Sequence, residues 1–137
     1  MNPEQIAKTS EHSHQAAFFC WCQQNKECYP LQFAFAIPNG GERNKREASR
    51  LKVEGVRKGV PDVFLPYPIK LTTSEARAGL WLEFKKPGTE KLKTGGASPE
   101  QKRYQEYLLS CGYEHKLVYS WLQAVTETID YISRGNV

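Results

Sequence analysis

Long apolar runs are missing from this sequence, and their absence excludes a membrane-spanning protein. The chain has 137 residues, and none of its segments approaches the roughly 20 consecutive apolar residues that a transmembrane helix needs. The stretch from Met1 to Ser10 is polar and contains no apolar signal core. We therefore expect no membrane partner and a cytoplasmic location.

The paired cysteine spacing of a zinc finger is also missing, and the cysteines fit a reducing compartment. The chain has four cysteines, Cys20, Cys22, Cys28 and Cys111. The first three, with His12 and His14 nearby, could suggest zinc, but the spacing does not match the paired Cys-x-x-Cys pattern. Two of them lie in a run that we expect to form a buried helix. We therefore favour free, buried thiols.

The overall charge balance is modest, but the basic residues are clustered. With 39% hydrophobic and 25% charged residues, the chain is expected to form one globular domain over 1–137. The net charge of +4 is compatible with a polyanionic partner without requiring one. One basic cluster comprises Arg43, Lys45, Arg46, Arg50, Lys52, Arg57 and Lys58, and a second comprises Lys85, Lys86, Lys91 and Lys93. Solvated surface is the alternative interpretation of both clusters.

The hydrophobic pattern predicts an α/β fold with the element order α-β-α-β-β-α-β-α. We expect helices over 11–24, 42–54, 98–111 and from 120 onward, and strands over 31–37, 60–65, 80–85 and 116–119. An uncertain connection covers 69–79, and a glycine-containing mobile loop covers 87–97. A mixed central sheet flanked by helices follows from this order.

Apolar spacing also predicts which side of these elements is buried. The strand over 31–37 is expected to turn one large-residue face inward, formed by Leu31, Phe33, Phe35 and Ile37. The expected apolar face of the third helix is formed by Tyr104, Tyr107, Leu108 and Cys111, and that of the last helix by Leu122, Val125, Ile129 and Ile132.

The most informative part of the sequence is a pair of short motifs on two expected strands. Gly59-Val60-Pro61-Asp62 places an acid at the mouth of one strand, and Trp81-Leu82-Glu83-Phe84-Lys85 places an acid and an amine inside the next. Residues two apart on a strand face the same side, so Glu83 and Lys85 project together while their neighbours point into the core. If the two strands pair, Asp62 joins them.

Two carboxylates and an ammonium at one point are the groups of a divalent-metal phosphodiesterase. Hard cations such as Mg²⁺ or Mn²⁺ prefer oxygen ligands, activate water and offset negative charge on a phosphate. Asp62 and Glu83 would be the core ligands, and the backbone carbonyl of Phe84 could add a third oxygen. Lys85 would orient the attacking water or stabilise developing charge. An edge strand with a Glu–Lys pair facing water is the alternative.

Taken together, these motifs resemble the PD-(D/E)xK nuclease superfamily and, within it, the VRR-NUC (virus-type replication-repair nuclease) domain. The matching features are Gly59-Val60-Pro61-Asp62, Glu83-Phe84-Lys85 and Ser98-Pro99-Glu100-Gln101, with Asn39-Gly40-Gly41, Arg43 and Gly112-Tyr113 resembling stand-alone phage-type members. The resemblance covers a core of about residues 10 to 132. It implies a restriction-endonuclease-like fold and a metal-dependent endonuclease.

The resemblance also implies roles for individual residues. It makes Asp62 and Glu83 metal ligands, Lys85 the catalytic lysine and Gln101 a glutamine beside that lysine. Glu11 best matches an acidic residue that approaches the metal from the first helix, and Gln15, one turn later, would line the same cleft. Two local alternatives remain: Glu11 also suits the positive end of a helix dipole, and Gln101 suits a capping box.

The substrate that the resemblance implies is branched DNA. Stand-alone viral members are small, dimeric and act on branches such as four-way (Holliday) junctions. By this resemblance we expect a homodimer, and a phage protein that acts inside its host cell. Phosphate contacts would position the DNA without reading its sequence. The candidate DNA-binding residues are Gln15, Gly40, Gly41, Arg43, Lys45, Arg46, Arg50, Lys86, Lys91 and Lys93. Alternatives are a sequence-targeted restriction-type nuclease, a flap nuclease and a non-catalytic DNA-binding module.

Overall fold

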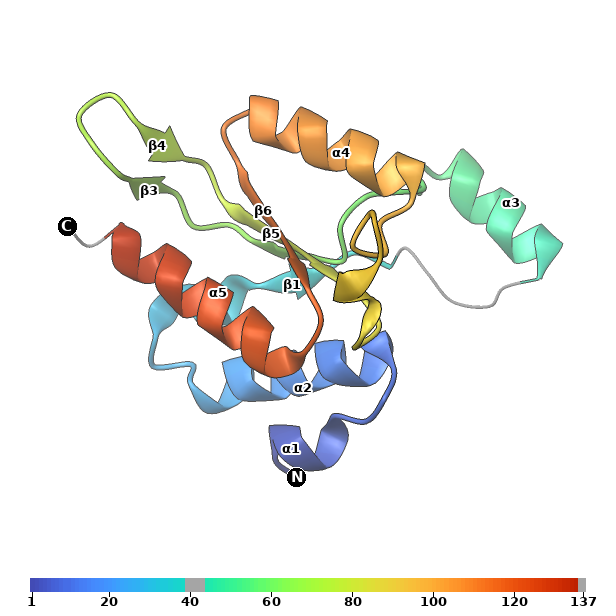
Figure 1. The fold of residues 1–137 in the computed structure, drawn as a ribbon, viewed down its shortest axis with the longest axis horizontal. Coiled ribbons are helices and arrows are strands. Elements are labelled where there is room, and N and C mark those ends of the chain that lie inside the picture. The colour runs from blue at the N-terminus through green and yellow to red at the C-terminus, as the bar shows by residue number, and fades with distance from the viewer. Residues whose placement is uncertain (39–43, 136–137) are drawn as a thin grey trace.

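The computed structural model describes residues 1–38 and 44–135 and has a mixed α/β architecture (Figure 1). Its helices are α1 (Pro3–Ile6), α2 (Glu11–Gln24), α3 (Lys45–Val53), α4 (Pro99–Ser110) and α5 (Trp121–Arg134), with short 3-10 helices η1 (Tyr29–Phe33) and η2 (Thr89–Lys91). Its strands are β1 (Phe35–Ala36), β2 (Val63–Leu65), β3 (Ile69–Lys70), β4 (Ala76–Arg77), β5 (Leu80–Phe84) and β6 (Glu114–Val118). The expected mixed sheet flanked by helices is confirmed.

The main sheet has the strand order β1-β2-β5-β6. Strand β2 pairs antiparallel with both β1 and β5, whereas β5 pairs parallel with β6. The register places Val63 opposite Leu82 and Glu83 opposite Leu117. The two strands that carry the acidic motifs are therefore neighbours, as expected.

The two faces of the sheet are covered by different helices. Helices α2 and α5 lie together on one side, and α4 lies on the other (Figure 1). The side chains of Leu82 and Phe84 point toward α2, where the ring centroid of Phe84 lies 6.0 Å from that of Phe18. Because strand residues alternate, Glu83 and Lys85 point toward α4. The alternation inferred from the sequence is thus present.

Local sequence signals explain the helix starts. The side chains of Ser10 and Ser98 accept hydrogen bonds from backbone N–H groups at the starts of α2 and α4, and Ser120 does so for α5. The side chain of Asn44 caps the start of α3, and the helix ends at Val53. The predicted range 42–54 begins at residues 42 and 43, which lie outside the described residues.

The strand predicted over 31–37 is wrong for most of its length. Residues Tyr29–Phe33 form a 3-10 helix, and only Phe35–Ala36 pairs with β2. Pro30 sits at the start of that helical turn, where its fixed φ suits a helix and its missing N–H costs nothing. Leu31 is buried, but Phe33 is 49% exposed and Phe35 is 48% exposed, so the predicted inward face of large residues is also wrong. The alternation of large and small residues therefore falls partly on a helical turn, where residues two apart do not share a side.

The predicted apolar faces of the last two helices are partly wrong. On α5, Leu122 and Ile129 are exposed, and Ala124, Thr128 and Tyr131 are buried instead. The hydroxyl of Tyr131 donates to the carbonyl of Tyr67 at 2.7 Å, which favours this rotation of the helix.

On α4, only Leu108 is fully buried, whereas Tyr107 and Cys111 are exposed. Large side chains at helical spacing did not reveal which side of either helix meets the sheet.

The remaining differences from the sequence expectations are local. The connection over 69–79 contains the β3–β4 hairpin, and the 87–97 loop contains η2 and is tied to the end of β6 by Tyr119, whose hydroxyl donates to the carbonyl of Gly95. Helix α1 was not predicted. Among the helices of the described residues, none has the length and apolar character that crossing a membrane would require.

Candidate active site

Asp62 lies at the end of the sheet between β2 and β5. It directly precedes the first residue of β2, and its carboxylate Oδ2 accepts a 2.8 Å hydrogen bond from the backbone N–H of Phe84. Its own carbonyl accepts a 2.7 Å bond from the N–H of Ile37. Burial raises the pKa of the Asp62 carboxyl, and the Phe84 hydrogen bond opposes that effect. The acid is therefore fixed where β2 would otherwise continue its pairing with β5.

Gly59 brings the segment before β2 close to the start of α4. Its φ of +92° lies in the left-handed region, and a Cβ at this position would lie 2.5 Å from the carbonyl oxygen of Glu100. Only glycine meets both requirements without strain. The Gly59-Val60-Pro61-Asp62 motif thus packs its first residue against the helix that carries Gln101.

Glu83 is 2% exposed, which is unusual for a carboxylate. Its Oε1 accepts a 2.8 Å hydrogen bond from Nε2 of Gln101, whereas its buried Oε2 has no partner among the described residues. Burial, followed by the negative charge of Asp62, raises the pKa of Glu83 far above its usual range. Two neighbouring carboxyl groups, one of them almost fully buried, are most stable when they share a proton or a cation.

Gln101 connects the acid to the lysine. Its Oε1 accepts bonds from Nζ of Lys85 at 2.5 Å and from the backbone N–H of Ser98 at 2.8 Å, while its Nε2 donates to Glu83. The Lys85 ammonium lies 4.0 Å from Oε1 of Glu83 and is 9% exposed as a residue. The capping box and the contact with the lysine are therefore both present, and one amide makes both.

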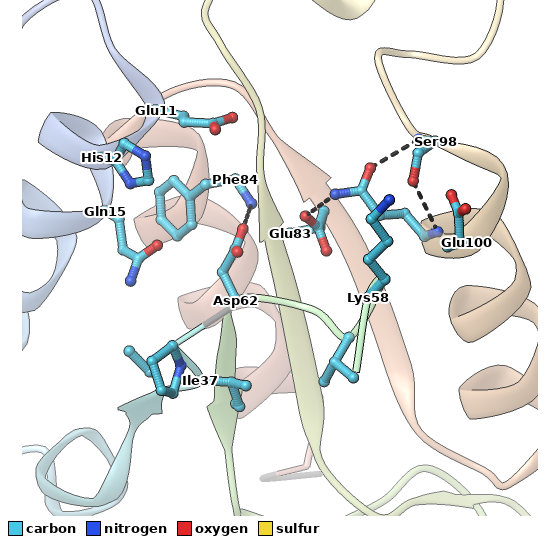
Figure 2. Close-up of a pocket in the computed structure, with 15 residues that line it drawn as sticks. Glu11, His12, Gln15, Ile37, Lys58, Asp62, Glu83, Phe84, Ser98 and Glu100 are labelled. Carbon is cyan, nitrogen blue, oxygen red and sulfur yellow. Dashed lines mark hydrogen bonds between the residues drawn. The ribbon is translucent and has the colours of Figure 1, made fainter. Parts of the chain in front are cut away.

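Asp62, Glu83 and Gln101 line a cleft of about 670 Å³, whereas Lys85 is not among the described residues that line it. Figure 2 shows Glu11 and Gln15 entering it from one side, Asp62 and Glu83 from the sheet, and Ser98 from the opposite side. The charge of Glu11 contributes to the raised pKa of both Asp62 and Glu83. The sequence-based expectation that the first turn of α2 borders the cleft therefore agrees with the structure.

The donor set at the end of β5 suits a hard cation. The unpartnered Oε2 of Glu83 and the carboxylate of Asp62 are oxygen donors. Lys85 donates its N–H to Val118 on β6, so by strand alternation the N–H and C=O of Phe84 point to the opposite edge, where Asp62 lies. Within residues 1–38 and 44–135, no three His, Cys, Asp or Glu side chains gather closely enough to hold a metal by themselves. Mg²⁺ in proteins nevertheless commonly uses one or two carboxylates and keeps several waters.

The cysteines and His14 have other surroundings. All four thiols are free. His14 is used structurally, because its Nδ1 accepts from the N–H of Trp121 and its Nε2 lies 2.8 Å from the carbonyl of Lys8. Cys22 is buried as expected, whereas Cys111 is exposed.

The candidate DNA-binding residues fall on two exposed segments. Lys45, Arg46 and Arg50 lie on α3, which has no buried residue and stands apart from the sheet in Figure 1. Lys86, Lys91 and Lys93 are exposed in the segment that follows β5. Gly40, Gly41 and Arg43 lie outside the described residues.

Several cleft residues were missed by the sequence analysis as site residues. His12, Lys58, Ser98 and Glu100 all line the cleft. Three of them adjoin residues that had been singled out: His12 follows Glu11, Lys58 precedes Gly59, and Glu100 precedes Gln101. The sequence signal that could have identified these three is their position next to a motif residue. Strand alternation and helical spacing did not predict that their side chains face the cleft.

No family model and no curated protein matches the sequence. A solved structure named "VRR_NUC domain protein" superposes with a TM-score of 0.72 at 22% sequence identity, covering 95% of this chain and 93% of that one. The superposition defines the class of protein by its fold, an α/β domain with a mixed sheet flanked by helices. That fold is the fold of a VRR-NUC domain.

Proposed function

We propose that this protein is a metal-dependent, structure-selective DNA endonuclease of the PD-(D/E)xK superfamily. The observation that carries the proposal is the arrangement around Gln101, whose amide binds Glu83 and Lys85 at an open cleft that also holds Asp62. The similarity in fold to a VRR_NUC domain protein supports the same assignment. Function depends on the site rather than on the fold alone.

Each group has a role in phosphodiester hydrolysis. Asp62, Glu83 and the carbonyl of Phe84 would hold Mg²⁺ or Mn²⁺, with Glu11 approaching from α2. When bound, such a cation lowers the pKa of a coordinated water and withdraws charge from the phosphate. Lys85 holds a positive charge beside the reacting groups, and Gln101 fixes the position of that ammonium.

The surface charges support a polyanionic substrate. The cations on α3 and after β5 are exposed and available to phosphates. A protein that neutralises several phosphates loses affinity steeply as salt rises. We propose that these contacts select DNA shape, with four-way junctions as the leading substrate and a homodimer presenting two active sites to two strands.

Cleavage of labelled four-way junction, flap and linear duplex DNA tests the proposal, with Mg²⁺ or Mn²⁺ against a chelator. Wild-type protein should cut branched DNA only with metal. Glu83→Ala and Lys85→Ala should abolish cutting, while Lys70→Ala, which removes an exposed ammonium on β3 outside the cleft, should retain it. Equal cleavage by wild type and Glu83→Ala would contradict the proposal.

Two further measurements separate the related assignments. Discrete bands from a long duplex would favour a sequence-targeted nuclease, and binding without any metal-dependent cutting would favour a DNA-binding module. Light scattering coupled to gel filtration measures the oligomeric state. A strict monomer that retains activity would remove the homodimer from the proposal.

A further inference from the structure

A second pocket adjoins the catalytic cleft beside the start of α4, and we propose that it holds an unpaired nucleotide of the DNA strand in the cleft. The pocket has a volume of about 550 Å³ and is lined by Arg57, Lys58, Glu100, Arg103, Tyr104 and Tyr107. The inference rests on the proposed nuclease function, because it extends the path of the same strand.

The pocket and the cleft share a wall. Lys58 and Glu100 line both hollows, and the close packing of Gly59 on Glu100 holds that wall together. A strand whose phosphate lies beside Asp62 and Glu83 can therefore continue past Lys58 into the second pocket without leaving the protein surface.

The charges in the pocket favour phosphate. Arg57, Lys58 and Arg103 are exposed, and none forms an ion pair within the described residues. Arg57 makes only a long 3.5 Å contact, from its Nη1 to the carbonyl of Lys52. Glu100 is the one acid among the described residues of this lining, so positive charge is in excess there and can meet a phosphate.

The two tyrosines indicate that the ligand is a nucleotide rather than a phosphate alone. Tyr104 and Tyr107 are three residues apart on α4 and therefore lie on the same side of the helix, and Tyr107 is 65% exposed. Aromatic rings beside cations form a stacking platform for single-stranded nucleic acid. Because a base pair inside a duplex has both faces covered by its neighbours, an unpaired base is the better partner for this platform.

Fluorescence anisotropy in a chelator measures binding by the full chain without cleavage. Wild-type protein should bind a duplex with a single-stranded overhang more tightly than the same duplex with blunt ends. Tyr107→Ala should weaken binding of the overhang DNA by roughly tenfold and remove most of the preference. Arg103→Gln should also weaken it, with a shallower dependence on salt.

Matched variants control for folding and for general charge. Tyr29→Ala removes a tyrosine that is 68% exposed elsewhere on the surface, and Lys102→Gln removes a charge from the exposed residue next to Arg103. Both should bind like wild type. Equal binding of overhang and blunt duplex by wild type, or an unchanged preference in Tyr107→Ala, would overturn the inference.

The same measurements distinguish failure of the pocket from failure of the nuclease proposal. A preference for overhang DNA without metal-dependent cutting would contradict the nuclease function and support the nucleotide pocket. Metal-dependent cutting without the preference would support the nuclease function and overturn the pocket.

Discussion

Gln101 donates a 2.8 Å hydrogen bond from its Nε2 to Oε1 of Glu83, although the two residues belong to the start of a helix and the end of a strand. The same amide accepts bonds from Lys85 and from the backbone of Ser98. The hydrogen bonds of Gln101 therefore fix the first turn of α4 relative to the end of β5 that carries Glu83. The local structure of the helix and the geometry of the site depend on one side chain.

The double role of Gln101 can be separated from simple capping. Gln101→Ala and Ser98→Ala each disrupt the capping box, and Ser98→Ala should lower the free energy of unfolding by about 1 kcal/mol. Gln101→Ala should lower it further, because the buried Glu83 and Lys85 lose a hydrogen-bond partner. Only Gln101→Ala removes the contacts with Glu83 and Lys85, and loss of hydrogen bonds to charged groups should reduce kcat by roughly tenfold or more. Thermal unfolding and cleavage rates check the pair. An equal loss of activity in Ser98→Ala would show that only the helix start matters.

The buried acid pair should make metal binding visible without any cleavage assay. In a chelator, Glu83→Gln should unfold at the same temperature as wild type or higher, because the amide is neutral without having to take up a proton in this buried position. Mg²⁺ or Mn²⁺ at a hundredfold excess over Kd should stabilise wild type by about 2.7 kcal/mol and leave Glu83→Gln unchanged. Glu106→Gln, on the exposed side of α4, should respond like wild type. A metal response retained by Glu83→Gln would place the cation elsewhere.

His115 should make the protein sensitive to acid. It is 6% exposed, its Nδ1 has no partner among the described residues, and burial lowers the pKa of the imidazole to about 4. The unfolded chain takes up the proton near its ordinary value and the folded chain does not, so stability is lost as pH falls between those two values. The loss is at most about 3 kcal/mol.

Chemical denaturation of wild type and His115→Leu across that pH range measures this contribution. The variant should lose less stability on acidification, because neither of its states binds the proton. Parallel pH profiles for the two proteins would show that His115 does not titrate differently on folding.

Two glycines with the same backbone conformation should differ in their tolerance of a side chain. Gly59 and Gly55 both have left-handed φ, at +92° and +101°, but a Cβ at Gly55 meets nothing within 4 Å, whereas one at Gly59 meets Glu100. Both alanine variants should be strained by about 1 kcal/mol or more. Gly59→Ala should in addition displace the start of α4 and reduce the rate of cleavage. Denaturant unfolding measures the loss of stability in both variants, and a cleavage assay measures the rate. Equal effects in both variants would mean that the packing on Glu100 is unimportant.

The sequence was most informative where a rule acts over a few residues. Ser98, Pro99 and Gln101 predicted the start of α4, because capping and the fixed φ of proline are local effects. Strand alternation predicted that Glu83 and Lys85 share a side. It failed over 31–37, where the alternating residues fall largely on a proline-initiated 3-10 turn.

The sequence by itself determined the acid–lysine strand, the capped helix that follows it and the fold class, because the period of a strand and the chemistry of a cap lie within short segments. Only the tertiary structure decided that Gln101 meets both Glu83 and Lys85, that Asp62 takes the place of a strand partner, and that Lys58 and Glu100 join two hollows. Those relationships depend on how β5 and α4 pack against each other. That packing is set by the rotation and position of whole helices and strands, which no short segment of sequence determines. The same reason explains why Leu122 and Ile129 are exposed on α5 despite their helical spacing.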